Sequence, residues 1–296
     1  MTFVQTPQPL SEWGSGIAPT GGASTEIAPQ VLRVTATNPS MMTGPGTNSY
    51  VIGSDRLIVI DPGPDDARHR RRLLEVIDGR PVEMVVVTHT HIDHAPGANP
   101  LARELGAPCG GFGEDDGFIP DVLLGEGDVV GQGDHQFEVL HTPGHASNHL
   151  CYLLSREQML FTGDHIMEGS TVVLRPPDAS LMDYLINLER LKHLSPPLRS
   201  LAPGHGRVIT NPVGIIDDIE HHRAQRHDLV RSCLESAQQG SPEELVALAY
   251  PEIDAQRRTV ATMSLWAHLR YLVQQGEASV EPGEQTMKSV FTLQSR

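Results

Sequence analysis

Short apolar runs rich in Val and Ile alternate with helical stretches over residues 31–205, and this alternation indicates an α/β protein. Strands are expected at residues 31–36, 49–53, 57–61, 83–89, 137–142, 149–154, 158–164 and 199–205. Helical patterns lie near residues 65–77, 99–105 and 180–194. Residues 1–30 are rich in Pro, Gly, Ser and Thr, and we expect them to form an N-terminal extension.

The last quarter of the chain has a different pattern. Helices are expected at about 213–236, 241–250 and 257–275, and a hairpin is expected between residue 278 and residue 293. Ser241, Pro242 and Glu244 form the signature of a capped helix start. Three helices and a hairpin predict a small winged-helix-like domain. The predicted organisation is therefore an extension (1–30), a catalytic domain (31–227) and a winged-helix-like domain (228–296).

Charge narrows the set of partners. The chain has 22 Lys and Arg against 37 Asp and Glu, a net charge of −15, which disfavours a polyanionic partner such as RNA. Residues 228–296 carry six Lys and Arg against nine Asp and Glu, so the winged helix is expected to act as a lid, spacer or dimerisation element. The sequence shows no signal peptide and no apolar run of membrane-spanning length, and we expect a cytoplasmic protein without a membrane partner.

Side chains that can bind a metal are most concentrated in "THTHIDHAPG" (88–97), which overlaps the end of an expected buried strand. This segment carries His89, His91, Asp93 and His94. Further candidates end strands or follow Pro-Gly turns: His145 in "HTPGH", Asp164 in "TGD" and His205 in "APGH". Imidazole and carboxylate groups favour Zn, Fe or Mn over Ca or Mg. The sequence therefore predicts a site for two ions, with seven ligand candidates.

The order H-x-H-x-D-H, P-G-H, G-D, P-G-H resembles the metallo-β-lactamase-fold hydrolase superfamily over about residues 31–210. The resemblance implies an αββα sandwich in which His89, His91 and His145 bind one metal, Asp93, His94 and His205 bind a second, and Asp164 bridges them. The segments 38–53, 163–173 and 201–206, with the helical tail, are similar to the β-lactamase-like protein 2 subgroup. Its animal mitochondrial member is a single-strand endoribonuclease, and fungal relatives are thioesterases of polyketide synthesis.

We expect a hydrolase with two zinc ions, or iron or manganese, whose metal-bridging hydroxide attacks a small ester or thioester. Asp93 is expected to orient the nucleophile and His149 to hydrogen-bond a ligand carboxylate, so both are predicted as catalytic residues. Three alternatives stay open: an endoribonuclease or phosphodiesterase on single-stranded RNA, a mononuclear iron sulfur dioxygenase, and a nucleic-acid-binding or scaffold protein with a structural metal. A homodimer is compatible with the sequence.

Several other polar residues are not predicted as metal ligands but could have other roles. We expect a structural or ligand-supporting role for His141 and a structural role for His165. Asp61, at a strand end, is assigned equally to a structural role or to support of a ligand. The pair His221–His222 with His227 favours a solvated or interface face of a helix.

Overall fold

The computed structural model describes residues 18–283 and 285–294, which divide into two compact units. The first contains residues 18–142, 148–171 and 190–216, and the second contains residues 143–147, 172–189 and the rest of the described chain from residue 217. Within the described residues, no helix is both long enough and apolar enough to cross a membrane.

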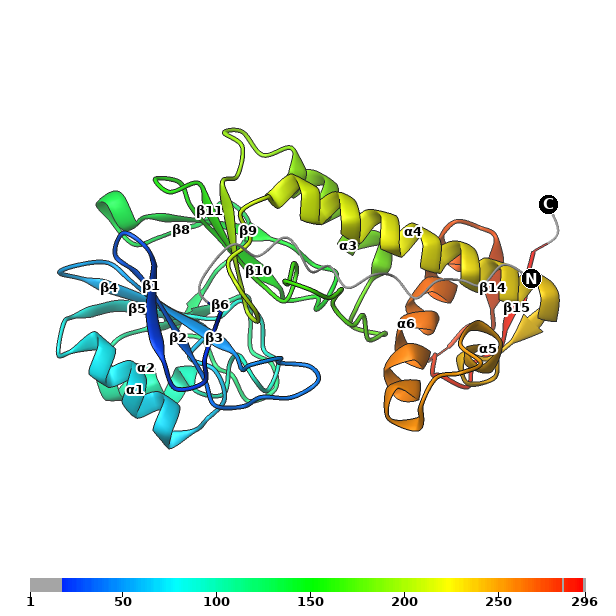
Figure 1. Ribbon diagram of the computed structural model, residues 1–296, viewed down its shortest axis with the longest axis horizontal. Helices are drawn as coiled ribbons and strands as arrows, with labels where there is room; N and C mark the ends of the chain where they lie inside the picture. Colours follow the sequence, from blue (N-terminus) through cyan, green and yellow to red (C-terminus); the bar gives the residue numbers. More distant parts are fainter. Residues whose placement is uncertain (1–17, 284, 295–296) are drawn as a thin grey trace. The chain divides into compact units, whose positions relative to one another are not determined.

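The first unit is built on two sheets (Figure 1). One has the order β1 (Ser24–Ala28), β2 (Val31–Thr35), β3 (Asn48–Ile52), β4 (Leu57–Ile60), β5 (Val82–Val86), β6 (Cys109–Gly111), β7 (Val122–Leu123). The other has the order β12 (Ser200–Pro203), β11 (Met159–Gly163), β10 (Leu150–Leu154), β9 (Phe137–His141), β8 (Val129–Val130). Strands β4 to β7 run parallel, as do β11 and β12, so several strands end at a common edge.

Two apolar cores hold these layers together. Ile58, Ile60 and Val86 from the first sheet pack with Phe137 and Tyr152 from the second, which buries the faces between the sheets. The opposite face of the first sheet packs against α1 (Ala67–Ile77) and α2 (Ala98–Leu105), visible beside it in Figure 1. Strand β4 lies between these layers and is buried on both faces, which explains its continuous apolar run.

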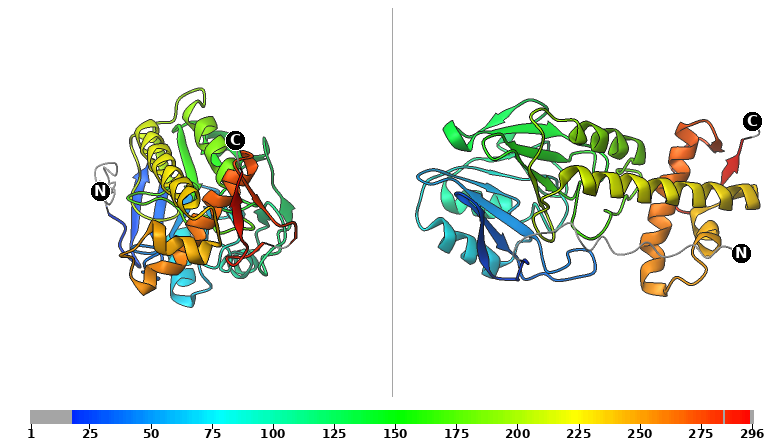
Figure 2. Two further views of the ribbon diagram at one scale, coloured as in Figure 1. Left: turned by 90° about the vertical axis from the view of Figure 1, so that its right-hand side faces the viewer. Right: turned by 45° about the horizontal axis from the view of Figure 1, so that its top comes forward.

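The second unit is mainly helical. It contains most of α3 (Leu181–Lys192) and α4 (Pro212–Ala237), then α5 (Pro242–Ala249), α6 (Ala255–Gln274) and a sheet of β13 (Gln239–Gly240), β15 (Phe291–Leu293) and β14 (Ala278–Val280). Figure 2 shows α6 in orange beside the red strands β14 and β15. The predicted helices and hairpin of the tail are therefore present.

The N-terminal region differs from the expectation of an extension up to residue 30. Residues 24–28 form β1, which pairs antiparallel with β2 at the edge of the first sheet. Its residues are half-buried or exposed, so the segment lacks the apolar run that identifies the inner strands. The remainder of the predicted extension includes residues 1–17, which lie outside the described residues.

Candidate metal centre

The ligand candidates lie directly after strands of both sheets. The predicted strand through His89 ends earlier, at Val86, so His89, His91, Asp93 and His94 lie in the loop that follows β5. Asp164 comes immediately after β11, and His205 comes two residues after β12. His145 lies in the loop 143–147 between β9 and β10. Rigid strands thus fix the starting point of each ligand-bearing loop.

Four ligand atoms converge with the spacing of a coordination shell. His205 Nε2 lies 3.2 Å from Asp93 Oδ2 and 3.3 Å from Asp164 Oδ1. His94 Nε2 lies 3.4 Å from Asp164 Oδ1, 3.7 Å from Asp93 Oδ2 and 3.4 Å from His205 Nε2. Ligands about 2.0–2.1 Å from a tetrahedral ion are separated from each other by roughly 3.3 Å. These residues therefore fit a metal ion.

A second group of ligand atoms is built around His89. Its Nε2 lies 2.9 Å from His91 Nδ1, and His89, His91 and His145 offer ligand atoms that lie within 4.8 Å of one another. His89, His94 and Asp164 meet the same criterion. Asp164 is therefore within reach of both groups, as the predicted bridging ligand requires.

Hydrogen bonds on Nδ1 orient most of the imidazoles. The partners of Nδ1 are Thr88 Oγ1 for His89 at 3.0 Å, Asp61 Oδ2 for His94 at 2.9 Å, the Val173 carbonyl for His145 at 2.9 Å and the Gly46 carbonyl for His205 at 3.3 Å. Where a carbonyl or carboxylate accepts from Nδ1–H, Nε2 keeps the lone pair that a metal needs.

Asp61 holds the loop after β5 by hydrogen bonds to Thr88 and His94. It is buried, with a left-handed φ of 48°, and its carboxylate accepts from Thr88 N at 2.6 Å, Thr88 Oγ1 at 2.7 Å and His94 Nδ1. Both roles that the sequence left open for Asp61 are thus combined, because one carboxylate holds the loop backbone and orients a ligand candidate.

His149 contacts the main chain of Asp164. The ring is fully buried; Nδ1 lies 2.9 Å from Thr142 Oγ1, and Nε2 accepts from the Asp164 N–H at 3.2 Å. His149 therefore holds the backbone of this ligand candidate. His141 stacks on the ring of Phe112, with ring centroids 4.4 Å apart.

Sequence reasoning did not identify a polar network beside the ligand loop. Thr90, between His89 and His91, donates to Asp115 Oδ2 at 2.8 Å, and Asn148 Nδ2 contacts both Thr90 Oγ1 and Asp115. Asp115 and Asn148 are loop residues far apart in sequence, so no local pattern could pair them.

The charges of the cluster stabilise one another. Burial alone would raise the pKa of each carboxyl group and lower that of each imidazole. Attraction between opposite charges reverses these effects at three of the residues: the pKa of Asp93 falls to about 2, that of Asp164 is held well below its usual range, and that of His205 rises to about 9. The carboxylates are ionised at neutral pH, and a metal that binds the imidazoles displaces their protons.

Comparison with known proteins agrees with this arrangement. Residues 42–205 match the metallo-beta-lactamase superfamily, and residues 241–285 match the beta-lactamase associated winged helix domain. The chain belongs to the metallo-beta-lactamase superfamily. The predictions of a metallo-β-lactamase-fold hydrolase, of its α/β fold and of a C-terminal winged helix are confirmed.

Individual relatives extend the likeness over most of the chain. A beta-lactamase-like protein 2 homolog of Drosophila melanogaster is 29% identical over 87% of this chain and 92% of its own length. An atrochrysone carboxyl ACP thioesterase of Aspergillus fumigatus is 30% identical over 79% of this chain and 69% of its own. The fold is shared with a beta-lactamase domain protein from Burkholderia ambifaria, with a TM-score of 0.77, 23% identity and coverage of 93% and 95% of the two chains.

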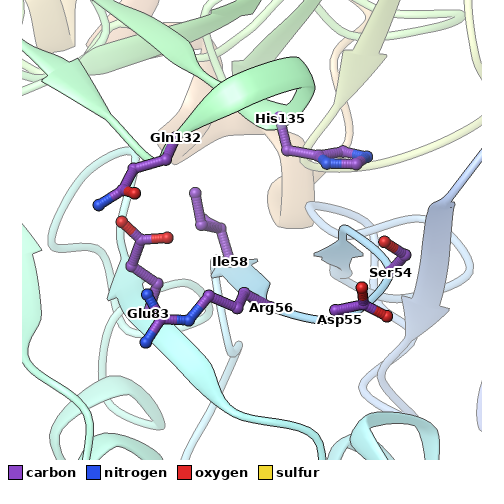
Figure 3. A pocket seen from close by; sticks show the side chains of 7 residues that line it. All are labelled: Ser54, Asp55, Arg56, Ile58, Glu83, Gln132 and His135. Carbon is purple, nitrogen blue, oxygen red and sulfur yellow. The ribbon is translucent and has the colours of Figure 1, made fainter.

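A small pocket of about 150 Å³ lies away from the ligand cluster. Figure 3 shows Ser54, Asp55 and Arg56 on one side of it, before β4, with Gln132 and His135 across from them. This end of β4 is opposite to the end that carries Asp61. Among the described residues, the groups suited to a metal do not include the lining of this pocket.

Proposed function

We propose that this protein is a dinuclear metal-dependent hydrolase that cleaves a small ester or thioester, with an acyl thioester as the favoured substrate. The observation that carries the proposal is the spacing of Asp93, His94, Asp164 and His205. Five separations between their ligand atoms, of 3.2–3.7 Å, match a coordination shell. His89, His91 and His145 would hold the other ion, and Asp164 would bridge.

Two bound dications, with zinc as the favoured metal, would supply hydroxide at neutral pH by lowering the pKa of water from about 15.7 to about 7. The chain's own residues orient this chemistry. The side chain of Asp93 is 22% exposed, against 0% for His94, 6% for His205 and 11% for Asp164. Asp93 is therefore the ligand in its group most open to solvent, which supports its role in orienting the nucleophile. His149 would act through Asp164 by holding its backbone.

The substrate class is supported by three observations. The relative from Aspergillus fumigatus is a thioesterase, which acts on an acyl group. Ile92, between His91 and Asp93, is 83% exposed and offers an apolar contact beside the ligands. The net charge of −15 disfavours RNA, because a phosphate backbone is repelled by an acidic protein.

The test begins with protein purified without chelator. Metal content is measured, and the protein is assayed with an acyl-thioester and with a fluorescent single-stranded RNA. Asp164→Asn is the site variant, and Asp55→Asn, at an exposed residue before β4, is the matched control. We expect about two zinc ions per chain and thioester hydrolysis that Asp164→Asn abolishes and Asp55→Asn retains.

Three outcomes would overturn the proposal. Two metals with cleavage of RNA alone would make the protein a nuclease. One iron per chain with neither activity would favour oxygen-dependent sulfur chemistry. A bound metal with no activity on any of these substrates, in wild type and variant alike, would favour a structural role for the metal.

A further inference from the structure

The loop that presents His145 is held by polar contacts from residues 172–189. The Ser180 N–H donates to the Gly144 carbonyl at 2.9 Å, and Asn187 Nδ2 donates to the Pro143 carbonyl at 2.9 Å. His145 Nδ1 lies 2.9 Å from the Val173 carbonyl. All six of these residues belong to the second unit. The position of His145 therefore depends on the segment 172–189.

Gly144 allows the loop 143–147 to lie close to the backbone of Tyr184. Its φ is 151°, and a Cβ at this position would lie 2.6 Å from the Cα of Tyr184. The loop thus packs backbone to backbone on the start of α3, and a displacement of Tyr184 would reach His145 through one intervening residue.

Arg223, on α4, contacts both parts of this support. Its Nη2 donates to the Val172 carbonyl, next to the carbonyl that orients His145. Its guanidinium carbon lies 5.2 Å from the centre of the Tyr184 ring. The Arg223 side chain therefore contacts both Val172, which adjoins the carbonyl at His145 Nδ1, and Tyr184, which packs on Gly144.

The burial of Arg223 needs an explanation. It is 3% exposed, and no carboxylate pairs with it among the residues that the structure describes. A buried charge without an ionic partner is costly, and an apolar residue of similar volume often fills such a place at lower cost. The planar guanidinium, however, donates to a carbonyl and stacks on a ring at the same time, which Met and Lys cannot do. The contacts with Val172 and Tyr184 are what this residue supplies.

We propose that Arg223 is a positioning residue for the metal ligand candidate His145. The inference rests on the proposed function, because it takes His145 as a ligand. By holding the carbonyl of Val172, next to the Val173 carbonyl that contacts His145 Nδ1, Arg223 keeps the proton of His145 on Nδ1 and leaves Nε2 available for the metal.

Arg226 provides a matched control on the same helix. It lies about one turn further along α4, and its guanidinium carbon is 5.3 Å from the centre of the Tyr250 ring. Both arginines therefore stack on a tyrosine, but the described contacts of Arg226 do not include the segment 172–189. Replacement of either by Met removes one stacked cation from α4.

The first experiment measures metal affinity by zinc competition against a chelating dye for wild type, Arg223→Met and Arg226→Met. We expect one of the two zinc equivalents to bind about 10–100-fold more weakly in Arg223→Met, the usual cost of losing support for a ligand. Arg226→Met should bind both as wild type does. If Arg223→Met does not fold, Arg223→Lys replaces it, and a loss of at least about threefold is expected because Lys cannot make both contacts.

The second experiment reads the imidazole directly in metal-free protein. Two-bond ¹⁵N–¹H spectra, with the His145 signals assigned from His145→Gln, report which ring nitrogen carries the proton. Wild type and Arg226→Met should show the Nδ1–H form of His145, and Arg223→Met should show a mixture of both forms. Unchanged affinity and unchanged tautomer in the Arg223 variant would overturn the inference. Wild-type protein that binds no metal would instead overturn the proposed function.

Discussion

The Nδ1 atom of His94 lies 2.9 Å from Oδ2 of Asp61, and the two side chains are 0% and 2% exposed. A carboxylate in this place only accepts hydrogen bonds, so it keeps the His94 proton on Nδ1. In Asp61→Asn, an amide that donates toward His94 would move the proton to Nε2, the atom that faces His205 and Asp164. We expect metal affinity and hydrolytic activity to fall by about 10–100-fold.

Asp61→Asn is also a mild change for the backbone. Asn tolerates the left-handed conformation that Asp61 adopts, with φ at 48°. The matched control is Asp128→Asn, since Asp128 also accepts from a backbone N–H, that of Gly125 at 2.7 Å. Zinc titration and thioester hydrolysis check the prediction, and an Asp61→Asn protein with wild-type affinity would show that the carboxylate does not orient His94.

Gly204 allows the ligands to approach one another. A Cβ at this position would lie 2.6 Å from Cε1 of His94 and 2.8 Å from Oδ1 of Asp164. Gly204→Ala must therefore displace two proposed ligands, and overpacking of this kind costs about 1–3 kcal/mol. We expect the variant to lose one metal equivalent and most of its activity, with a lower free energy of unfolding.

Gly125→Ala is the control for Gly204→Ala, because a Cβ there would meet only Asp128 Oδ2 at 3.9 Å. Metal content and urea unfolding of both variants are compared. The interpretation fails if Gly204→Ala retains two metals per chain while both variants unfold alike.

A strand could be predicted from the sequence where its own residues carry an apolar pattern, and could not where its pairing depends on distant residues. Strand β4 was predicted because it is a continuous apolar run, and β5 because its last three residues are apolar. Strand β6 has the sequence CGG and β7 only VL, so neither carries a periodic pattern. Their pairing depends on neighbours that are distant in sequence.

The same distinction applies to the site. Seven ligand candidates were found because His and Asp follow strands at recognisable spacings, and the structure brings their ligand atoms together in the groups described. Arg223 gave no such signal: it lies within "EHHRAQRH", which has the composition of a solvated helix face. Its burial depends on the segment 172–189, which is distant in sequence, so local periodicity cannot reveal it.

His222, on the same helix, is half-buried, and burial lowers its pKa to about 4.

The start of α5 should contribute stability without affecting the chemistry. The Glu244 N–H donates to Ser241 Oγ at 3.3 Å, and the Ser241 N–H donates to Glu244 Oε2 at 2.8 Å. Ser241→Ala removes the cap and should lower the free energy of unfolding by about 1 kcal/mol. Ser236→Ala, at an exposed residue of α4, is the control. Denaturant unfolding measures the difference, and a Ser241→Ala protein as stable as this control would contradict the assigned cap.

Buried His69 should make stability depend on pH. It is 3% exposed, its Nε2 lies 2.8 Å from Ser49 Oγ, and burial lowers its pKa from 6.5 to about 4. As pH falls below 6.5, the unfolded chain takes up a proton at this residue before the folded protein does. The folded state therefore loses stability between about pH 6.5 and pH 4, with a contribution of about 2 kcal/mol at most by pH 5.

His69→Asn removes the titrating group, and its effect is measured as a difference between two pH values. Urea unfolding of chelator-treated wild type and variant at pH 7.5 and pH 5.0 separates this contribution from metal loss. The substitution itself lowers stability at both pH values, because a buried ring is replaced by a smaller side chain. Wild type should nevertheless lose more stability than His69→Asn on going to pH 5.0. Equal losses would mean that His69 takes up its proton as readily in the folded protein as in the unfolded chain, and that its burial between α1 and β3 imposes no penalty on the charged form.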